Sequence, residues 1–217
     1  MTGYAVDVFI IIFLFALFGY SHSLLASNKL KRLAISYAGN YIAFYRLVYN
    51  ILSILIVYVL FDISPHPDII IYDLKYPYDF IILVPQYLSL AGFIWSLRLF
   101  SIKEFLGISQ IERWFNNQYD INELDENLTL RIRGAYRFMR HPLYFFSIMF
   151  LLFRPVMDLF YLTCLICIII YFYVGSYYEE KRLVEKFGEA YIKYRKEVPR
   201  IFPVKFYKPY KEKITLD

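Results

Sequence analysis

The chain has 217 residues, of which 59% are hydrophobic and 21% are aromatic, and its formal net charge is +5. Its mean hydropathy of +0.43 is too high for an ordinary soluble domain. The composition therefore indicates an integral membrane protein. The basic residues are spread along the chain and not gathered in one patch, which argues against a nucleic-acid partner.

Four long apolar stretches stand out, near residues 8–26, 41–61, 80–100 and 142–179. A membrane-spanning helix needs about 20 residues, and the last stretch is about twice that length. Arg154, Pro155 and Asp158 interrupt it, which predicts a tight hairpin of two spans with its turn at this break. We therefore expect an all-α polytopic membrane protein with about five transmembrane helices, of which the last two form a helical hairpin.

The distribution of charge predicts the orientation in the cell (inner) membrane. Lys29, Lys31 and Arg32 follow the first span, and further cations follow the third span and residue 180. The loop at residues 62–79, in contrast, is mainly acidic. Since cytoplasmic loops carry the excess of Lys and Arg, the N-terminus is expected outside and the C-terminus in the cytoplasm. The first span lacks the basic start of a signal peptide and is expected to remain as a helix.

These features divide the single predicted membrane domain, residues 1–217, into three parts. Residues 1–100 hold the first three helices, residues 101–141 form a cytoplasmic connecting segment, and residues 142–217 hold the hairpin and a C-terminal segment.

In that last segment, five apolar residues repeat at helical spacing: Leu183, Phe187, Tyr191, Tyr194 and Val198. The pattern predicts an amphipathic cytoplasmic helix that Pro199 ends. Its apolar face is expected either to lie on the membrane or to cover a bound ligand.

The stretch "RFMRHPLY" places Arg140 and His141 directly before Pro142, which suits the first turn of a helix. Cations are unfavourable at a helix N-terminus unless an anion also binds there. The pattern therefore predicts a site for a carboxylate or phosphate, the alternative being a lipid-headgroup anchor.

Glu179 and Glu180 follow the fifth span, where the helix dipole disfavours them, and the alternative for this pair is a solvated charge cluster. The hairpin returns Glu179 to the level of Arg140. Together the two ends would suit an amphoteric ligand.

No metal site is predicted, because the three histidines, His22, His66 and His141, lack the spacing of metal ligands. Cys164 and Cys167 lie within an apolar span without a second pair, and we interpret them as small core residues. The chain also lacks a glycine-rich nucleotide loop.

Three elements in the last third of the chain resemble a known signature: "RHPLY", "EEKRL" and "FGEAYIKYRKEVPRIFP". Their order and spacing are similar to those of the integral membrane methyltransferases related to isoprenylcysteine carboxyl methyltransferase and the phospholipid methyltransferases. Upstream, "HSLLASNKLKRL", "YRLVYN" and "EFLGISQ" resemble the methanethiol S-methyltransferase and NnrU-like branch.

This resemblance implies a five-helix enzyme that binds S-adenosylmethionine at the cytoplasmic ends of its last helices and releases S-adenosylhomocysteine. The cofactor-binding residues that it implies are Arg140, His141, Pro142, Tyr144, Glu179, Glu180, Tyr191 and Tyr194. One departure is Phe146, since relatives commonly have glycine two residues after the motif tyrosine.

Three residues are candidates for contact with the methyl acceptor. His22 is an ionisable group inside a span, with a packing role as its alternative. Arg46 has the same status and could instead extend its side chain toward the cytoplasm. Gln110 matches the thiol-methylating branch. Methyl transfer requires alignment and no covalent nucleophile.

Three functions stay open from the sequence. The first is methylation of a small thiol such as methanethiol, to dimethyl sulfide. The second is methylation of a lipid, either an isoprenylcysteine carboxylate or a phosphatidylethanolamine-like amine. The third is a non-enzymatic, NnrU-like membrane protein. The sequence carries no signal for an oligomeric state.

Overall fold

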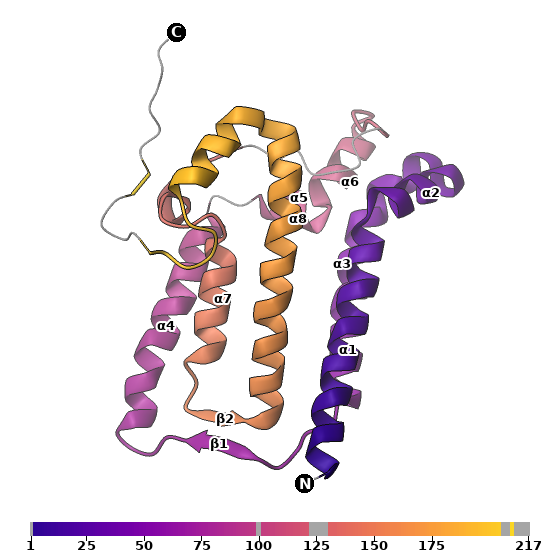
Figure 1. Ribbon diagram of the computed structural model, residues 1–217. Coiled ribbons are helices and arrows are strands. Elements are labelled where there is room, and N and C mark those ends of the chain that lie inside the picture. Colours follow the sequence, from indigo (N-terminus) through magenta and orange to yellow (C-terminus); the bar gives the residue numbers. More distant parts are fainter. Residues whose placement is uncertain (1, 99–100, 122–129, 205–208, 211–217) are drawn as a thin grey trace. The chain divides into compact units, whose positions relative to one another are not determined.

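The computed structural model describes residues 2–98, 101–121, 130–204 and 209–210. Parts of the predicted connecting and C-terminal segments, residues 122–129, 205–208 and 211–217, lie outside the described residues. The described elements are, in chain order, α1 (Thr2–Ala26), α2 (Asn28–Ala38), η1 (Gly39–Phe44), α3 (Tyr45–Ile63), β1 (Ile70–Asp73), α4 (Tyr78–Leu97), α5 (Ile102–Leu106), α6 (Ile108–Phe115), η2 (Gly134–Arg137), α7 (Pro142–Leu152), β2 (Val156–Asp158) and α8 (Leu159–Glu197) (Figure 1).

The prediction of an all-α polytopic membrane protein is confirmed. Among the described residues, four helical stretches are long and apolar enough to cross a membrane: Gly3–Ala26, Asn28–Ile63, Tyr78–Leu97 and Leu159–Glu197. Most of their surface is exposed because lipid, and not protein, would cover it. A membrane-spanning helix requires a sufficiently long run of apolar residues, so the hydropathy of the sequence was enough to locate these helices.

The chain forms two compact units, which we describe separately. The first unit comprises Met1–Pro67 and Ser101–Leu128, and the second comprises Asp68–Phe100 and Thr129–Asp217. In the first unit α1 packs against α3, and Ser27 begins α2 by accepting a hydrogen bond from the backbone N–H of Leu30 at 3.3 Å. The division of one membrane domain into residues 1–100, 101–141 and 142–217 stays a prediction.

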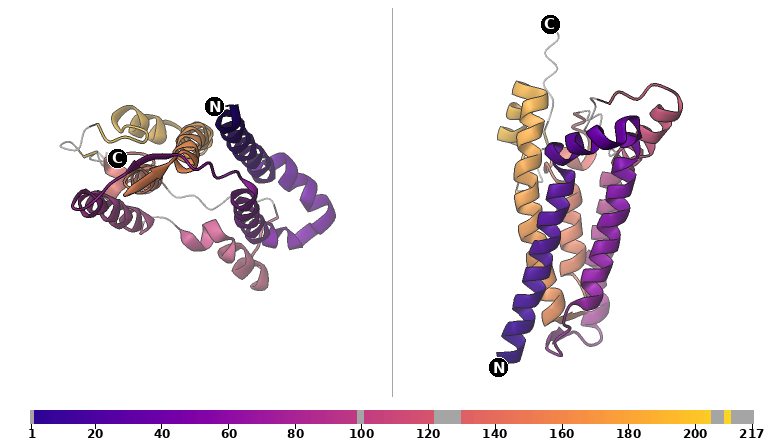
Figure 2. Two further views of the ribbon diagram at one scale, coloured as in Figure 1. Left: turned by 90° about the horizontal axis from the view of Figure 1, so that it is seen from below. Right: turned by 90° about the vertical axis from the view of Figure 1, so that its right-hand side faces the viewer.

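In the second unit α7 packs against both α4 and α8, and the three helices run side by side (Figures 1 and 2). α7 and α8 form the predicted hairpin, and their turn lies at the predicted break. Asp158 begins α8, since its Oδ1 accepts from the backbone N–H of Tyr161 at 2.8 Å. α7 has only 11 residues, about 16 Å of helix, so it is shorter than the hydrocarbon core of a bilayer.

A two-stranded ribbon joins the loop before α4 to the hairpin turn. β1 and β2 pair antiparallel, with Ile70 opposite Asp158 and Asp73 opposite Val156. Tyr72 donates a hydrogen bond to the carbonyl of Arg154 at 3.1 Å, close to the end of α7. The ribbon therefore fixes the ends of α4, α7 and α8 that lie away from the N-terminus of α7 (Figure 1).

The predicted amphipathic helix, residues 183–198, lies in the last part of α8, where a break at Gly188 divides it. This glycine has φ 54° and ψ −132°, a conformation that side chains with a Cβ rarely adopt. Tyr191, Tyr194 and Val198 are buried and pack with Tyr210 and the partly buried Leu130. The apolar face thus packs against the chain itself, while its register is as the sequence predicted.

Phe146, the departure from the signature, packs against a glycine on α4. A Cβ added to Gly92 would lie 2.2–2.5 Å from the ring carbons of Phe146, so any larger residue here would force that ring to move. The small residue that permits close approach of α4 and α7 therefore lies on α4.

Candidate functional site

The start of α7 is held by the C-terminal segment of the chain. The backbone N–H of Arg140 donates to the carbonyls of Pro199, at 2.9 Å, and Arg200, at 3.1 Å. The N–H of His141 donates to the carbonyl of Arg200 at 2.9 Å, and Pro142 occupies the first turn of α7. The segment after α8 thereby fixes the position of the Arg140 and His141 side chains.

Glu180 is the centre of a buried ion cluster. Its Oε1 lies 3.1 Å from Nε2 of His141, 3.2 Å from a terminal nitrogen of Arg140 and 3.4 Å from Nε of Arg200. The residue is only 1% exposed. A buried carboxylate is tolerable only with such partners, since desolvation of an unpaired charge costs several kcal/mol.

The other oxygen of this carboxylate, Glu180 Oε2, is buried and has no hydrogen-bond partner within the described part of the chain. The same holds for Nε of Arg140. Buried polar atoms are nearly always satisfied, so these two atoms mark a place where a ligand could add partners.

Glu179 lies on the other side of the histidine. Its Oε2 accepts a hydrogen bond from the hydroxyl of Tyr144 at 3.0 Å and lies 3.4 Å from Nδ1 of His141. The rings of His141, Tyr144 and Phe172 stack with centroid separations of 5.2 and 4.4 Å. Both glutamates therefore contact the histidine, although neighbouring residues of a helix point about 100° apart.

These contacts set the protonation of His141. Burial acts to lower the pKa of His141, but the hydrogen bonds and negative charges of Glu179 and Glu180 outweigh it, and the net effect raises the pKa above its ordinary value of 6.5. Both ring nitrogens face carboxylates, an arrangement that favours the protonated imidazolium over the neutral ring. The side chains of Arg140 and His141 are thus paired with carboxylates of α8.

The aromatic residues of the C-terminal helix support this cluster. Tyr194 donates a hydrogen bond to the carbonyl of Tyr136 at 2.6 Å, just before α7. The rings of Tyr191 and Tyr194 lie 5.7 Å apart, and those of Tyr194 and Tyr210 lie 5.5 Å apart. Burial, together with the charge of Glu179, raises the pKa of Tyr136 to about 12, so its phenol stays neutral.

Arg200 was not among the residues predicted from the sequence. Besides its contact with Glu180, its guanidinium lies over the ring of Tyr173, 5.1 Å from the centroid. Its carbonyl also accepts from both residues that precede Pro142. It follows the helix-ending Pro199 directly, and that position was the one signal that could have identified it.

The three residues predicted to contact the methyl acceptor belong to the first unit. His22 and the segment before Gln110 both contact residues of α3. His22 contacts Tyr49, whose hydroxyl lies 2.6 Å from its Nε2, and Ser53, whose Oγ lies 3.0 Å from its Nδ1. Arg46 does not simply extend to solvent, because its Nε donates to the carbonyl of Phe105 at 2.9 Å.

Gln110 lies in the same unit and is buried, with an exposed fraction of 6%. Its Nε2 donates to the carbonyl of Glu104 at 3.1 Å and lies 3.2 Å from the carboxylate of that residue, which also pairs with Arg113 at 2.6 Å. The contact of His22, Arg46 and Gln110 with a methyl acceptor stays a prediction.

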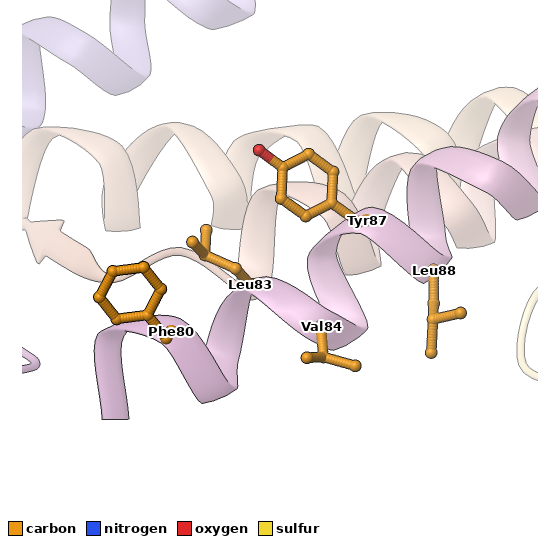
Figure 3. Close-up of a pocket in the computed structure, with 5 residues that line it drawn as sticks. All are labelled: Phe80, Leu83, Val84, Tyr87 and Leu88. Atoms are coloured by element: carbon orange, nitrogen blue, oxygen red, sulfur yellow. The ribbon is translucent and has the colours of Figure 1, made fainter. Parts of the chain in front are cut away.

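A pocket of about 480 Å³ lies on the surface of α4 and is formed by side chains of that helix alone (Figure 3). Its lining is almost wholly apolar: Phe80, Leu83, Val84, Tyr87 and Leu88. An apolar helix face of this kind suits contact with lipid chains and offers no chemistry. The candidate site is therefore the ion cluster at the start of α7.

The structure defines the class of this protein as an all-α integral membrane protein with a buried arginine, histidine and glutamate cluster at one end of its helices. No protein-family profile matches the chain, and no solved structure matches it. Two curated proteins are similar to it.

"Methanethiol S-methyltransferase 1" of Bradyrhizobium diazoefficiens is 27% identical over 206 residues, which are 93% of this chain and 69% of that protein. "Methanethiol S-methyltransferase" of Pseudomonas deceptionensis is 38% identical over 68 residues, which are 31% of this chain and 26% of that protein. These similarities support a membrane methyltransferase like the methanethiol S-methyltransferases.

Proposed function

We propose that this protein is an S-adenosylmethionine-dependent methyltransferase that acts on a small thiol, most simply methanethiol, which it would convert to dimethyl sulfide. The observation that carries the proposal is the buried carboxylate of Glu180. One of its oxygens is surrounded by three basic side chains, while the other has no hydrogen-bond partner among the residues that the structure describes. The names of both similar proteins support the choice of acceptor.

The chemistry of the site fits the cofactor. Oε2 of Glu180 could accept from a hydroxyl or ammonium group, and Nε of Arg140 could donate to a carboxylate. S-adenosylmethionine carries groups of both kinds. We propose that Arg140, His141 and Glu180 hold it, together with Pro142, Tyr144, Glu179, Tyr191 and Tyr194.

When bound, S-adenosylmethionine would supply an electrophilic methyl group on its sulfonium sulfur. The residues of the chain would align the two reactants and exclude water. His141 is not suited to act as a base, because both ring nitrogens already face carboxylates. We assign His141 instead the task of holding Glu179 and Glu180 in place.

The first test is calorimetric titration of the detergent-purified protein with S-adenosylhomocysteine, which needs no knowledge of the acceptor. We expect saturable binding that is lost in Glu180→Gln and kept in Glu189→Gln, a control at an exposed position of the same helix. Unchanged affinity in folded Glu180→Gln would overturn the site assignment. A folded wild-type protein without binding would favour the non-enzymatic alternative.

The second test identifies the acceptor. The purified protein and S-adenosylmethionine are supplied with methanethiol, an isoprenylcysteine or phosphatidylethanolamine, and methylated products are measured by gas chromatography or mass spectrometry. Dimethyl sulfide as the main product would support the proposal. Methylation of only the prenylcysteine or the amino-lipid would establish the lipid alternative.

We further propose that the cluster faces the cytoplasm and that the N-terminus lies outside the inner membrane. Lys and Arg gather near the cluster, whereas Asp73 and Asp79 lie at the opposite end of the second unit. Reporter fusions at both termini test this orientation. A C-terminal fluorescent protein that folds only in the cytoplasm should be active, and an inactive fusion would reverse the assignment.

A further inference from the structure

The second unit contains a separate pocket beside the ion cluster, at the end of α8. Its volume is about 220 Å³, and four charged residues line it: Arg140, Arg195, Lys196 and Glu197. Three cations therefore face one carboxylate. This excess of positive charge favours an anionic occupant.

One of these cations is built into the protein. The side chain of Arg140 is only 8% exposed, and its Nε has no hydrogen-bond partner among the described residues. One terminal nitrogen contacts Glu180 at 3.2 Å, and the other donates to the carbonyl of Arg195 at 3.3 Å. Arg140 thus separates the two sites, with Glu180 on one side and the pocket on the other.

The remaining lining is apolar and comes from Val198, Pro199 and Val204. The pocket also lies where the apolar helices begin, since Arg140 is two residues from Pro142, the first residue of the apolar α7. A membrane protein meets phospholipid headgroups at this depth. A cationic wall beside an apolar wall is suited to a phosphate that is attached to a glycerol.

We propose that this pocket binds the phosphate group of an anionic glycerophospholipid at the membrane surface. The lipid would be a ligand of this face and not a methyl acceptor. The proposal rests on Arg195, Lys196 and the apolar lining, which the proposed cofactor site does not use, whereas Arg140 lines both sites.

The test measures the binding of short-chain phosphatidylglycerol to the detergent-purified full chain by native mass spectrometry. Phosphatidylglycerol is a suitable probe because it has neither an amine nor a thiol. The variant is Arg195→Gln with Lys196→Gln, and the matched control is Lys186→Gln with Lys193→Gln. The control removes the same charge from exposed positions of α8 outside the pocket.

Removal of two cations should weaken phosphatidylglycerol binding about 30-fold, because each contributes about a factor of five at a membrane surface. The control should bind within about threefold of the wild type. Equal weakening in the two variants would overturn the proposal, since it would show only a general effect of surface charge.

Two competition experiments separate the other sources of an anion. Displacement of phosphatidylglycerol by millimolar inorganic phosphate alone would show that the pocket takes a free anion and would overturn the lipid assignment. Displacement by S-adenosylhomocysteine would assign the pocket to the cofactor and would also overturn it. Simultaneous binding of both ligands supports two separate sites, whereas absent S-adenosylhomocysteine binding would count only against the proposed function.

Discussion

Replacement of Glu180 by glutamine tests the central role of this residue in the stability of the site. Glutamine keeps the size of the side chain and one acceptor oxygen but removes the negative charge. Three cationic groups, from Arg140, His141 and Arg200, would then share one neutral oxygen. The change is expected to be strongly destabilising, although no apolar contact is lost.

The magnitude follows from burial. Removal of one partner from a buried ion pair costs about 3–5 kcal/mol, and the retained acceptor places Glu180→Gln near the lower limit, about 3 kcal/mol. For a chain of this length, 1 kcal/mol changes the Tm by about 2–4 °C. We therefore expect the Tm of Glu180→Gln to fall by about 6–12 °C.

Glu179→Gln is the matched comparison, because its side chain is 41% exposed and its hydrogen bond is from Tyr144. Glutamine keeps an acceptor for Tyr144, so the main loss is the charge that faces His141 at 3.4 Å, which at this half-exposed position is expected to cost about 1 kcal/mol and 2–4 °C. Both Tm values can be measured by differential scanning fluorimetry of protein in one detergent. Similar losses for the two variants would refute the argument that burial makes Glu180 the centre of the cluster.

Three further predictions concern neighbouring contacts. Since the pKa of His141 is raised in the folded protein, its stabilising contribution is complete below pH 6.5 and is lost as pH rises through the raised value. The Tm of His141→Gln should therefore fall less over that pH range than the Tm of the wild type. Equal slopes of Tm against pH in the two proteins would contradict this. Arg200→Gln should weaken S-adenosylhomocysteine binding about tenfold through the contact with Glu180, and Arg200→Lys should restore most of it; a lysine variant as weak as the glutamine variant would show that charge is not what matters. Gly92→Ala should cost about 1–3 kcal/mol by overpacking against Phe146, and Phe146→Ala in the same protein should recover part of the loss, whereas additive thermal shifts would exclude this contact as the cause.

Local chemistry was sufficient to predict the long apolar helices and the hairpin. The interruption by Arg154, Pro155 and Asp158 marks the turn because a charged or helix-breaking residue is costly within an apolar span. Asp158 then also begins α8. The face that contains Tyr191 and Tyr194 is determined by helical spacing alone, so its register could be predicted from the sequence.

Contacts between distant segments were harder to predict. β1 and β2 are short strands separated by more than 80 residues, and neither has the length or alternation that marks a strand in a sequence. The pairing of Phe146 with Gly92 depends on how two helices approach each other, and the sequence of α7 contains no information on the residue opposite.

In the candidate site, too, features set by local sequence were predicted and contacts between distant segments were not. Arg140 and Glu180 were predicted because their charges oppose the helix dipole at two helix ends that a hairpin brings together. The sequence suggested an external anion as the partner of Arg140, whereas the structure pairs it with the carboxylate of Glu180. Arg200 lies outside any helix, and its role depends on the return of the chain to α7.

The contact between Arg200 and the start of α7 also has a consequence for synthesis. The chain leaves the ribosome from its N-terminus, so Arg140 and Glu180 are made before the carbonyls of Pro199 and Arg200 that hold the start of α7. A chain that stops within α8 would still insert its apolar helices into the bilayer. Such a fragment would lack the carbonyls that accept from the N–H groups of Arg140 and His141, so the start of α7 would not be held in place.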